Sequence, residues 1–239
     1  WNHPENIGGN IEKKAREARY KLLYDFCQTI GCKCLFVAHH KLDQWETFFM
    51  RLARGSSLKG LSCMKRISLN NDIYLNRPML DFSPFDIKET LKNRFGIENY
   101  VCDPSNNKLQ FERVRWRKSY EVLAKEYGLG IENVSKAIER LQRANDCLND
   151  MAYSISKEIF EEGYINIARF KALHEELKIR VLDFIIKSVF DKNNIISYSL
   201  LKRASFKICE QYFSAINLSG VILRRYKTKN VKVYKENRP

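Results

Sequence analysis

The sequence predicts an α/β fold, and three observations support this prediction. Near the start of the chain a helical pattern, a short apolar run and a second helical pattern follow one another, which indicates a parallel sheet layered with helices. A long helical stretch occupies the middle of the chain, and the last part combines strand-like alternation with many basic side chains. We therefore expect a Rossmann-like parallel-sheet domain over residues 1–117, a helical bridge over 118–164 and a small, basic α+β domain over 165–239.

The composition is that of a folded protein with an excess of positive charge. Of 239 residues, 44% are hydrophobic, and 42 Lys and Arg face 28 Asp and Glu, which leaves a net charge of +14. The excess is spread over both halves of the chain and is not a basic tail. A protein that is basic throughout favours a polyanionic partner, above all nucleic acid. The alternative is that the positive charge reflects only a lysine-rich composition and no particular partner.

The cysteines and the apolar runs argue against zinc-binding, disulfide-rich and membrane-spanning classes of protein. The seven cysteines are scattered without a C-x-x-C pair, which argues against a zinc site and against a disulfide framework. No apolar run approaches the roughly 20 residues that span a bilayer. We expect a soluble, cytoplasmic protein that binds no membrane.

The first elements can be placed from periodicity and from their end signals. Apolar residues at helical spacing predict a helix over 10–30 that Gly31 ends, and "CKCLFVA" (32–38) predicts a buried strand. The stretch "AHHKLDQWETFFMRLARG" (38–55) begins where that strand ends and continues as a helix that Gly55 closes, and "GSSLKGL" (55–61) reads as a flexible loop. In parallel sheets, ligands bind beyond the carboxyl ends of the strands, so the position of 38–55 favours a functional site.

The later elements follow in the same way. "DIYLNRPML" (72–80) predicts a second strand, and a helix follows in which Ser83 caps, Pro84 takes the first position and Gly96 ends the helix. Helical spacing runs over 110–163 with a break near 128–130. From Ile165 onward we expect two helices and a hairpin, "SGVILRRYKTKNVKVYKE" (219–236).

Four side chains at the start of the 38–55 helix are candidate catalytic residues. Asp43 and Glu46 are three residues apart, so they could hold Mg²⁺ against nucleotide phosphates, or form a capping box in which Asp43 caps and Glu46 reaches back. The spacing alone favours the capping box, and the two alternatives are compatible. His39 and His40 close the strand, and because adjacent strand residues point to opposite faces, we expect one of them to face the site.

Pairs of arginines provide candidate phosphate and RNA contacts. Arg16 and Arg19 share one helical face, and Arg51 and Arg54 share another, a spacing that suits bidentate phosphate binding as well as a solvated basic surface. In "FERVRWR", arginines alternate with other residues and would fan out over more than one face of a helix. The candidate RNA contacts there and in the basic hairpin are Arg113, Arg115, Arg117, Arg224, Arg225 and Lys227.

Four motifs in order resemble those of bacterial tRNA(Ile)-lysidine synthetases, which belong to the PP-loop ATPases. They are "AREARY" (15–20), "AHHKLDQWETFFMRLARGSSLKGL" (38–61), "RPML" (77–80) and "DPSNNKLQFERVRWR" (103–117). Residues 165–239 are similar to the small substrate-binding domain of that family. The resemblance implies an ATP-dependent carbon–nitrogen ligase, in which the C2 oxygen of the wobble cytidine is adenylated and the ε-amino group of free lysine displaces AMP. The modified tRNA(Ile), which has a CAU anticodon, then reads AUA in place of AUG.

The resemblance also implies roles for the candidate residues. Asp43 and Glu46 would handle Mg²⁺ and the lysine ammonium, and His39 and His40 would support the adenylate pocket. The arginines at positions 16, 19, 51 and 54 would contact ATP phosphates or the tRNA. The partners implied are ATP, free lysine and tRNA(Ile), and the oligomeric state stays open, with a homodimer among the alternatives.

Two departures from the family accompany the resemblance. The family's S-G-G-x-D-S phosphate loop does not occur in these 239 residues, so we expect an incomplete parallel-sheet domain, an opposite pocket wall before Trp1, and little or no ligase activity from this chain alone. Val114 stands where the family usually has Asn. A tRNA-binding remnant without catalysis and a related tRNA cytidine 2-thiolase are the alternatives, and the thiolase is disfavoured because cysteine pairs are absent.

Overall fold

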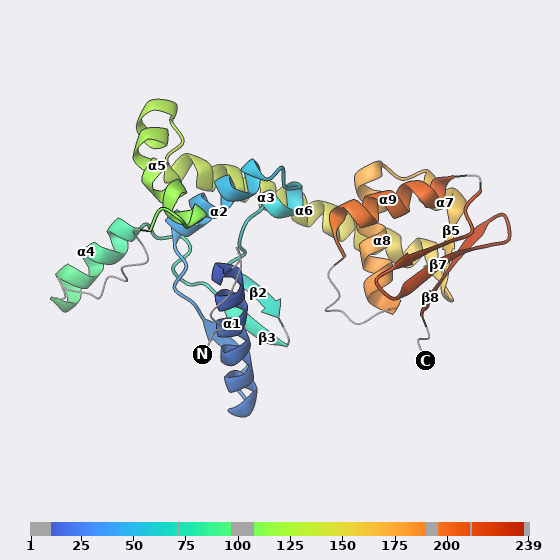
Figure 1. Cartoon of the computed structure of the whole chain (residues 1–239), viewed down its shortest axis with the longest axis horizontal. Helices are drawn as coiled ribbons and strands as arrows, with labels where there is room; N and C mark the ends of the chain where they lie inside the picture. The colour runs from blue at the N-terminus through green and yellow to red at the C-terminus, as the bar shows by residue number, and fades with distance from the viewer. Residues whose placement is uncertain (1–10, 71, 97–107, 190–195, 211, 237–239) are drawn as a thin grey trace. The chain divides into compact units, whose positions relative to one another are not determined.

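The computed structural model describes residues 11–70, 72–96, 108–189, 196–210 and 212–236. It divides into two compact units, Trp1–Gln142 and Arg143–Pro239, which are described separately below (Figure 1). The division falls inside the stretch 118–164 that the sequence predicts as a helical bridge. The first five residues of the motif at 103–117 lie outside the described residues.

The first unit contains a small sheet and most of the helices. Its elements are α1 (Ile11–Thr29), β1 (Cys34–Phe36), α2 (Lys41–Ala53), α3 (Leu58–Leu61), β2 (Ile67–Asn70), β3 (Ile73–Asn76), α4 (Pro84–Phe95), α5 (Glu112–Tyr127) and the start of α6 (Ile131–Ile159). Strand β3 lies between β1 and β2, pairs in parallel with β1 and antiparallel with β2. The predicted parallel pair is therefore confirmed, whereas β2 was not predicted.

The end signals of the helices hold, and two local expectations do not. Gly31 and Gly96 adopt left-handed conformations after α1 and α4, with φ of 67° and 64°, and Ser83 caps α4 through the backbone N–H of Asp86. Residues 58–61, expected to be a loop, form the short helix α3. The strand expected to be buried is short and only partly covered, since Phe36 is 64% exposed.

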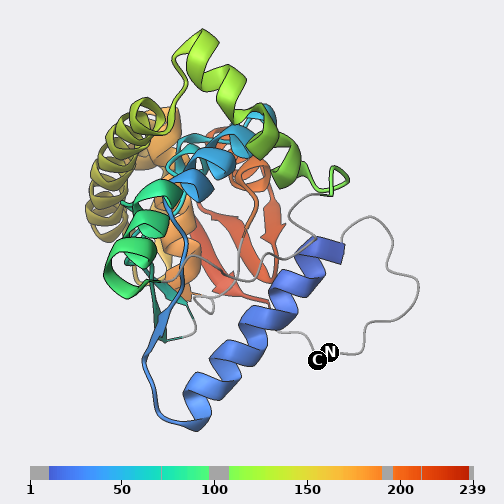
Figure 2. The same cartoon turned by 90° about the vertical axis from the view of Figure 1, so that its left-hand side faces the viewer.

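A shared core holds α2 against α5 and the first part of α6. Trp45 and Phe49 of α2 pack with Val134 and Ile138 of α6, and Trp116 and Tyr120 of α5 pack against this cluster. The indole N–H of Trp45 donates to the carbonyl oxygen of Leu129 at 2.7 Å. Figures 1 and 2 both show α5 beside α2. This packing brings the start of α2 and the start of α5 together.

The second unit is a five-stranded antiparallel sheet with helices on one face. Its elements are the end of α6, β4 (Phe160–Glu161), β5 (Tyr164–Asn166), α7 (Ile167–Lys171), α8 (Glu175–Val189), α9 (Tyr198–Cys209), β6 (Ala215–Leu218), β7 (Val221–Tyr226) and β8 (Asn230–Lys235), and the strand order is β4-β5-β8-β7-β6. The C-terminal hairpin β7–β8 is confirmed. Three helices replace the two that were expected, and strands β4 to β6 were not predicted.

Side-chain alternation gives this sheet a buried face and an open face. Leu223 of β7 and Val231 and Val233 of β8 are almost fully buried and share one core with Leu182 and Ile185 of α8. Their neighbours along the strands point the other way, as the period of two in a strand requires. The basic and aromatic residues of the hairpin therefore lie mainly on the side away from the helices.

The described part of the chain holds no helix that is both long enough and apolar enough to cross a membrane. The cysteines within the described ranges are free thiols.

The register of β7 can be tested with two neighbouring residues. Leu223→Ala should lower the free energy of unfolding by about 2–5 kcal/mol because it opens a cavity in the core. Ile222→Ala, the adjacent residue on the open face, should have an effect of about 1 kcal/mol or less. Urea denaturation followed by circular dichroism measures both, and the opposite order would mean that the strand is shifted by one residue.

Candidate active site

The candidate site is built around the start of α2. His40 is the N-cap residue: its Nδ1 accepts from the backbone N–H of Asp43 at 3.3 Å, and its own backbone N–H donates to Asp43 Oδ2 at 2.9 Å. A capping box is present, as the spacing suggested, but it joins His40 to Asp43. The expected box between Asp43 and Glu46 is wrong, because the helix begins at Lys41 and Asp43 already holds its third position.

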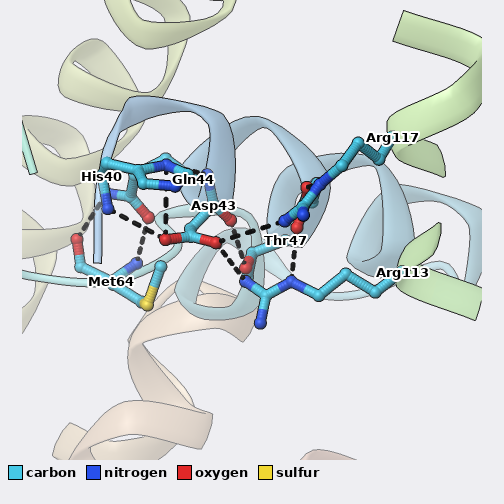
Figure 3. A network of polar contacts seen from close by, with 8 residues as sticks. His40, Asp43, Gln44, Thr47, Met64, Arg113 and Arg117 are labelled. Atoms are coloured by element: carbon cyan, nitrogen blue, oxygen red, sulfur yellow. Dashed lines mark hydrogen bonds and ion pairs between the residues drawn. The ribbon is translucent and has the colours of Figure 1, made fainter. Parts of the chain in front are cut away.

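Glu46 is released from capping and binds two arginines. Its side chain is fully buried, and each carboxylate oxygen accepts from a different guanidinium: Oε1 from Nε of Arg117 at 2.6 Å, and Oε2 from Nε of Arg113. Asp43 Oδ1 lies 3.2 Å from Arg113 Nη2 and 3.9 Å from Arg117 Nη2 (Figure 3). Two carboxylates and two guanidinium groups thus form one network, the carboxylate–arginine cluster.

Helix spacing explains why these four side chains meet. Asp43 and Glu46 are three residues apart on α2, and Arg113 and Arg117 are four apart on α5, so each pair lies on one helical face. Arg115 lies off that face and donates to the carbonyl oxygens of Leu109 and Gln110. The expected fanning of the three arginines is therefore observed.

Hydrogen bonds of two further α2 residues, Gln44 and Thr47, stabilise the part of the helix that carries the carboxylates. The side-chain amide of Gln44 both donates to Met64 O at 2.7 Å and accepts from Met64 N at 2.9 Å, which holds the segment after α3 against α2 (Figure 3). The Thr47 hydroxyl donates to the carbonyl oxygen of Asp43 at 2.7 Å. These bonds hold in place the first two turns of α2, which carry Asp43 and Glu46.

His39 lies in a cationic environment and is kept neutral. Its pKa is lowered to about 4, chiefly by burial and also by the positive charges of Arg16, Arg77 and Arg113, while the charge of Asp43 acts in the opposite direction. Its Nδ1 is buried and has no hydrogen-bond partner, and the same is true of Nε of Arg77. Buried polar atoms without partners are uncommon in folded proteins and indicate a place where a ligand can bind.

Arg77 acts on His39 but was not predicted from the sequence as a residue of the candidate site. It is 7% exposed and donates to Lys65 O at 2.7 Å and to the Ser68 hydroxyl at 3.1 Å. Burial lowers its pKa from the ordinary value for arginine, with Arg16 acting in the same direction. The motif "RPML" contained the signal, but a lone arginine before a proline did not stand out as a site residue.

The four arginines predicted to contact phosphates have different surroundings. Arg16 and Arg19 lie over the ring of Tyr20, at 5.0 and 5.8 Å from its centroid, and Arg16 also acts on His39. Arg51 donates to Gly60 O at 2.6 Å and Arg54 pairs with Glu112. Of these four, only Arg16 shares an environment with the candidate catalytic residues.

The predicted two-carboxylate magnesium site does not fit this geometry. Both oxygens of Glu46 are occupied by guanidinium groups, and the side chain has no exposed surface. No group of three His, Cys, Asp or Glu side chains suited to a metal ion occurs within the described ranges. Asp43, with 12% of its side chain exposed, is the remaining carboxylate that could face a bound ion.

The candidate RNA contacts of the hairpin fall into two groups. Arg224 is exposed on the open face of the sheet, and Lys227 lies in the β7–β8 turn with its ammonium 5.5 Å from the ring centroid of Tyr226. Arg225 has the opposite orientation along β7 and donates to Glu210 O at 3.0 Å and Thr228 O at 3.3 Å. Arg225 therefore serves the fold in this structure, and a direct RNA contact is better supported for Arg224.

Comparisons with known proteins show which family the chain is similar to. The family model of the PP-loop domain matches residues 2–123. The chain is 36% identical to a tRNA(Ile)-lysidine synthase of Wolbachia pipientis wMel, over 98% of this chain and 54% of that protein. It is also 35% identical to the same enzyme of a Wolbachia from Brugia malayi (93% and 52%), and 28% identical to that of Orientia tsutsugamushi (99% and 55%). The chain spans about half the length of these curated relatives.

The carboxylate–arginine cluster predicts a large effect of a small change. Glu46→Gln should lower the free energy of unfolding by about 2–3 kcal/mol, because loss of a buried charge leaves two guanidinium groups without their partner. The matched control is Glu112→Gln, which breaks an exposed pair with Arg54 and should change stability by less than about 1 kcal/mol. Equal effects in urea denaturation would contradict the special role of Glu46.

His39 predicts a specific pH dependence of stability. Because its pKa is about 4 in the folded chain and about 6.5 in the unfolded chain, the unfolded chain binds more protons between these values. Stability should therefore fall as the pH is lowered from 6.5 to 4, and His39→Gln should fall less steeply. Denaturation series of both proteins at several pH values measure the difference, and parallel curves would contradict it.

Proposed function

The chain belongs to the tRNA(Ile)-lysidine synthetase family of PP-loop proteins, and we propose that it carries the lysine- and tRNA-facing part of such a ligase. The observation that carries the proposal is the carboxylate–arginine cluster. It joins residues of the two longest family motifs into one network, because Glu46 bonds to Arg113 and Arg117, which lie 67 and 71 residues further along the chain. The proposed substrates are ATP, free lysine and a tRNA(Ile) with a CAU anticodon.

The proposed reaction has two steps. The C2 oxygen of the wobble cytidine attacks the α-phosphorus of ATP, so that an O–P bond forms and pyrophosphate leaves. The ε-amino group of lysine then attacks C2, the C2–O bond breaks, AMP leaves and the amine loses a proton. Negative charge develops on phosphate oxygens in both steps, so the site needs cations that are fixed in advance.

Arg113 and Arg117 are suited to that requirement. Glu46 engages the Nε atom of each, which orients both guanidinium planes from one side, and their side chains keep 26% and 37% of their surface exposed. Guanidinium groups stay charged at any physiological pH, and their planar donor arrangement matches phosphate oxygens. We therefore assign Glu46 as a positioning residue for these arginines, and the arginines as contacts for the adenylate phosphate or the tRNA.

The surroundings of His39 support a second anionic contact. Arg16 and Arg77 act on His39 together with Arg113, and two buried nitrogen atoms there have no partner. A neutral imidazole can offer a hydrogen bond without adding charge, whereas Arg16 and Arg77 supply positive charge. This combination suits nucleotide phosphates better than the pair Arg51 and Arg54, which are bonded to Gly60 and Glu112.

Asp43 is the proposed partner of the lysine substrate. Its Oδ2 accepts from His40, which directs the carboxylate, and the group keeps a partly exposed surface next to the cluster. ATP is the nucleotide that the PP-loop family implies. Mg²⁺ is proposed only as the companion of the ATP phosphates. Of the two carboxylates predicted to hold it, Asp43 has exposed surface, whereas Glu46 is enclosed by arginines.

The remaining assignments follow from the family. We propose cytoplasmic action on tRNA and a tRNA-binding role for residues 165–239, and we leave a homodimer open. A tRNA-binding remnant and a cytidine 2-thiolase are the alternatives that the sequence allows. The relatives described above are all named as lysidine synthases, which favours the ligase over both alternatives.

The proposal is tested by incorporation of radiolabelled lysine into a CAU-anticodon tRNA(Ile) transcript in the presence of ATP. These 239 residues should be assayed alone and together with any coding sequence that adjoins them in the gene, with little or no incorporation expected from the 239 residues alone. Within the active protein, Arg113→Gln and Asp43→Asn should each reduce incorporation by about 100-fold or more, because a preorganised contact to developing charge is lost.

The control is Arg54→Gln, which breaks only the exposed pair with Glu112 and should keep incorporation within about two-fold. A second control is the methionine tRNA with the same anticodon, which should stay unmodified. Normal incorporation by Arg113→Gln would remove the cluster from the mechanism. Binding of tRNA without any lysine transfer in either assay would favour the remnant.

A further inference from the structure

The open face of the sheet in the second unit carries an ordered set of aromatic and basic side chains. We call this set the outer sheet face and define it as Tyr164, Arg224, Tyr226, Asn230, Lys232 and Tyr234. Strand register places Tyr164, Lys232 and Arg224 in one row across β5, β8 and β7, and Asn230 and Tyr226 in the next row. Three strands therefore contribute to one continuous surface.

The rings and cations of this surface contact one another. The centroids of Tyr164 and Tyr226 are 5.1 Å apart with the rings tilted by 49°. The ammonium of Lys232 lies 5.9 Å from the centroids of both Tyr164 and Tyr234. The side chains thus hold one another in place, which lowers the entropy lost when a ligand binds.

Nothing in the sheet's own core requires these residues. The core lies on the opposite face, where α8 packs against Val231, Val233 and Leu223. Tyr226 is 42% exposed, and Arg224 and Lys232 are exposed as well. One exposed and two partly exposed tyrosines, placed among cations on the side away from the helices, match the surface that RNA-binding sheets present to unpaired bases.

A hollow adjoins this surface at the β4 edge. It has a volume of about 470 Å³, and its lining combines Tyr164, the amides of Asn166 and Asn230, and three carboxylates against one guanidinium (Glu158, Glu161, Glu162 and Arg169). Amide and carboxylate groups can bond to the edges of a base, whereas carboxylates repel phosphate. The hollow thus favours a base edge, and the row of Lys232 and Arg224 favours the phosphates.

We propose that the outer sheet face binds a single-stranded stretch of the tRNA, with a base stacked on Tyr164 and Tyr226 and its backbone along Lys232 and Arg224. The inference rests on the proposed function, because it names the surface with which the second unit contacts its tRNA. The base edge lies toward the hollow. Double-stranded RNA is excluded, since its bases are stacked inside the helix and cannot lie on the rings.

The test uses the whole chain and a fluorescent single-stranded RNA of about eight nucleotides, a length within the usual site size of such surfaces. Fluorescence anisotropy gives the dissociation constant at several salt concentrations, and the same RNA annealed to its complement is the comparison. We expect the single strand to bind more tightly. Tyr226→Ala should weaken its binding about ten-fold, whereas Tyr226→Phe, which keeps the ring, should stay within about two-fold.

Matched controls lie on α9, on the helical side of the unit. Tyr198 is 43% exposed, so Tyr198→Ala removes an equally exposed ring and should leave RNA binding unchanged. Lys232→Ala should reduce the slope of log affinity against log salt by about one, and Arg203→Ala, which removes the same charge from α9, should not. Tyr164→Ala gives an independent second test, and circular dichroism confirms that each variant is folded.

The outcomes separate this inference from the proposed function. Binding of the single strand that is unaffected by Tyr226→Ala and Tyr164→Ala would overturn the outer sheet face and leave the ligase proposal intact. Equal binding of duplex and single strand would also overturn it. Failure of the unmodified chain to bind either the RNA or tRNA(Ile) would instead count against the tRNA-binding role itself.

Discussion

The structure of the candidate site depends on one buried carboxylate. Glu46 has no exposed surface, and a lone charge in that position would be unstable by several kcal/mol. Arg113 and Arg117 each bond to a different oxygen, so the charge is stable only while α5 lies against α2. The aromatic core of Trp45, Phe49 and Trp116 supplies the packing, and the ion pairs set the alignment of the two helices.

This alignment links the cap of α2 to its chemistry. Because His40 caps the helix, Asp43 is held through its Oδ2 while Oδ1 faces the two guanidinium groups. The carboxylate of Asp43 therefore belongs both to the capping box and to the carboxylate–arginine cluster. A change at any of these positions acts on helix formation, on charge and on ligand contact together, which is why stability and activity must be measured separately in each variant.

Much of the fold could be predicted from the sequence because it depends on local signals. Glycine stops, the Ser83 cap and the alternation of the last hairpin are read within a few residues of each other. Strands β2, β4, β5 and β6 have two to four residues each, too few to show a period, and they were missed. Strands β1 and β3 are as short, but each lies within a longer strand-like run of the sequence, 32–38 and 72–80. In the candidate site, the sequence predicted roles for Asp43, Glu46 and His39, with Glu46 as a metal ligand, and it predicted Arg113 as an RNA contact and not as a partner of Glu46. The two partners of Glu46 lie 67 and 71 residues away, and no spacing rule reveals contacts over that distance.

The adjacent residues Arg224 and Arg225 show what charge alone leaves undecided. Both belong to the basic hairpin, and composition treats them as equal contributors to the net charge of +14. In β7 they point to opposite faces, and Arg225 bonds to two carbonyl oxygens of its own unit while Arg224 joins Lys232 and Tyr164 in one row. Arg225 lies over the partly buried ring of Phe213, 5.8 Å from its centroid, whereas Arg224 is exposed beside Lys232, whose ammonium lies 5.9 Å from the ring centroid of Tyr164. The alternation of the strand therefore selects which of the many basic residues can meet a phosphate and a base at the same time.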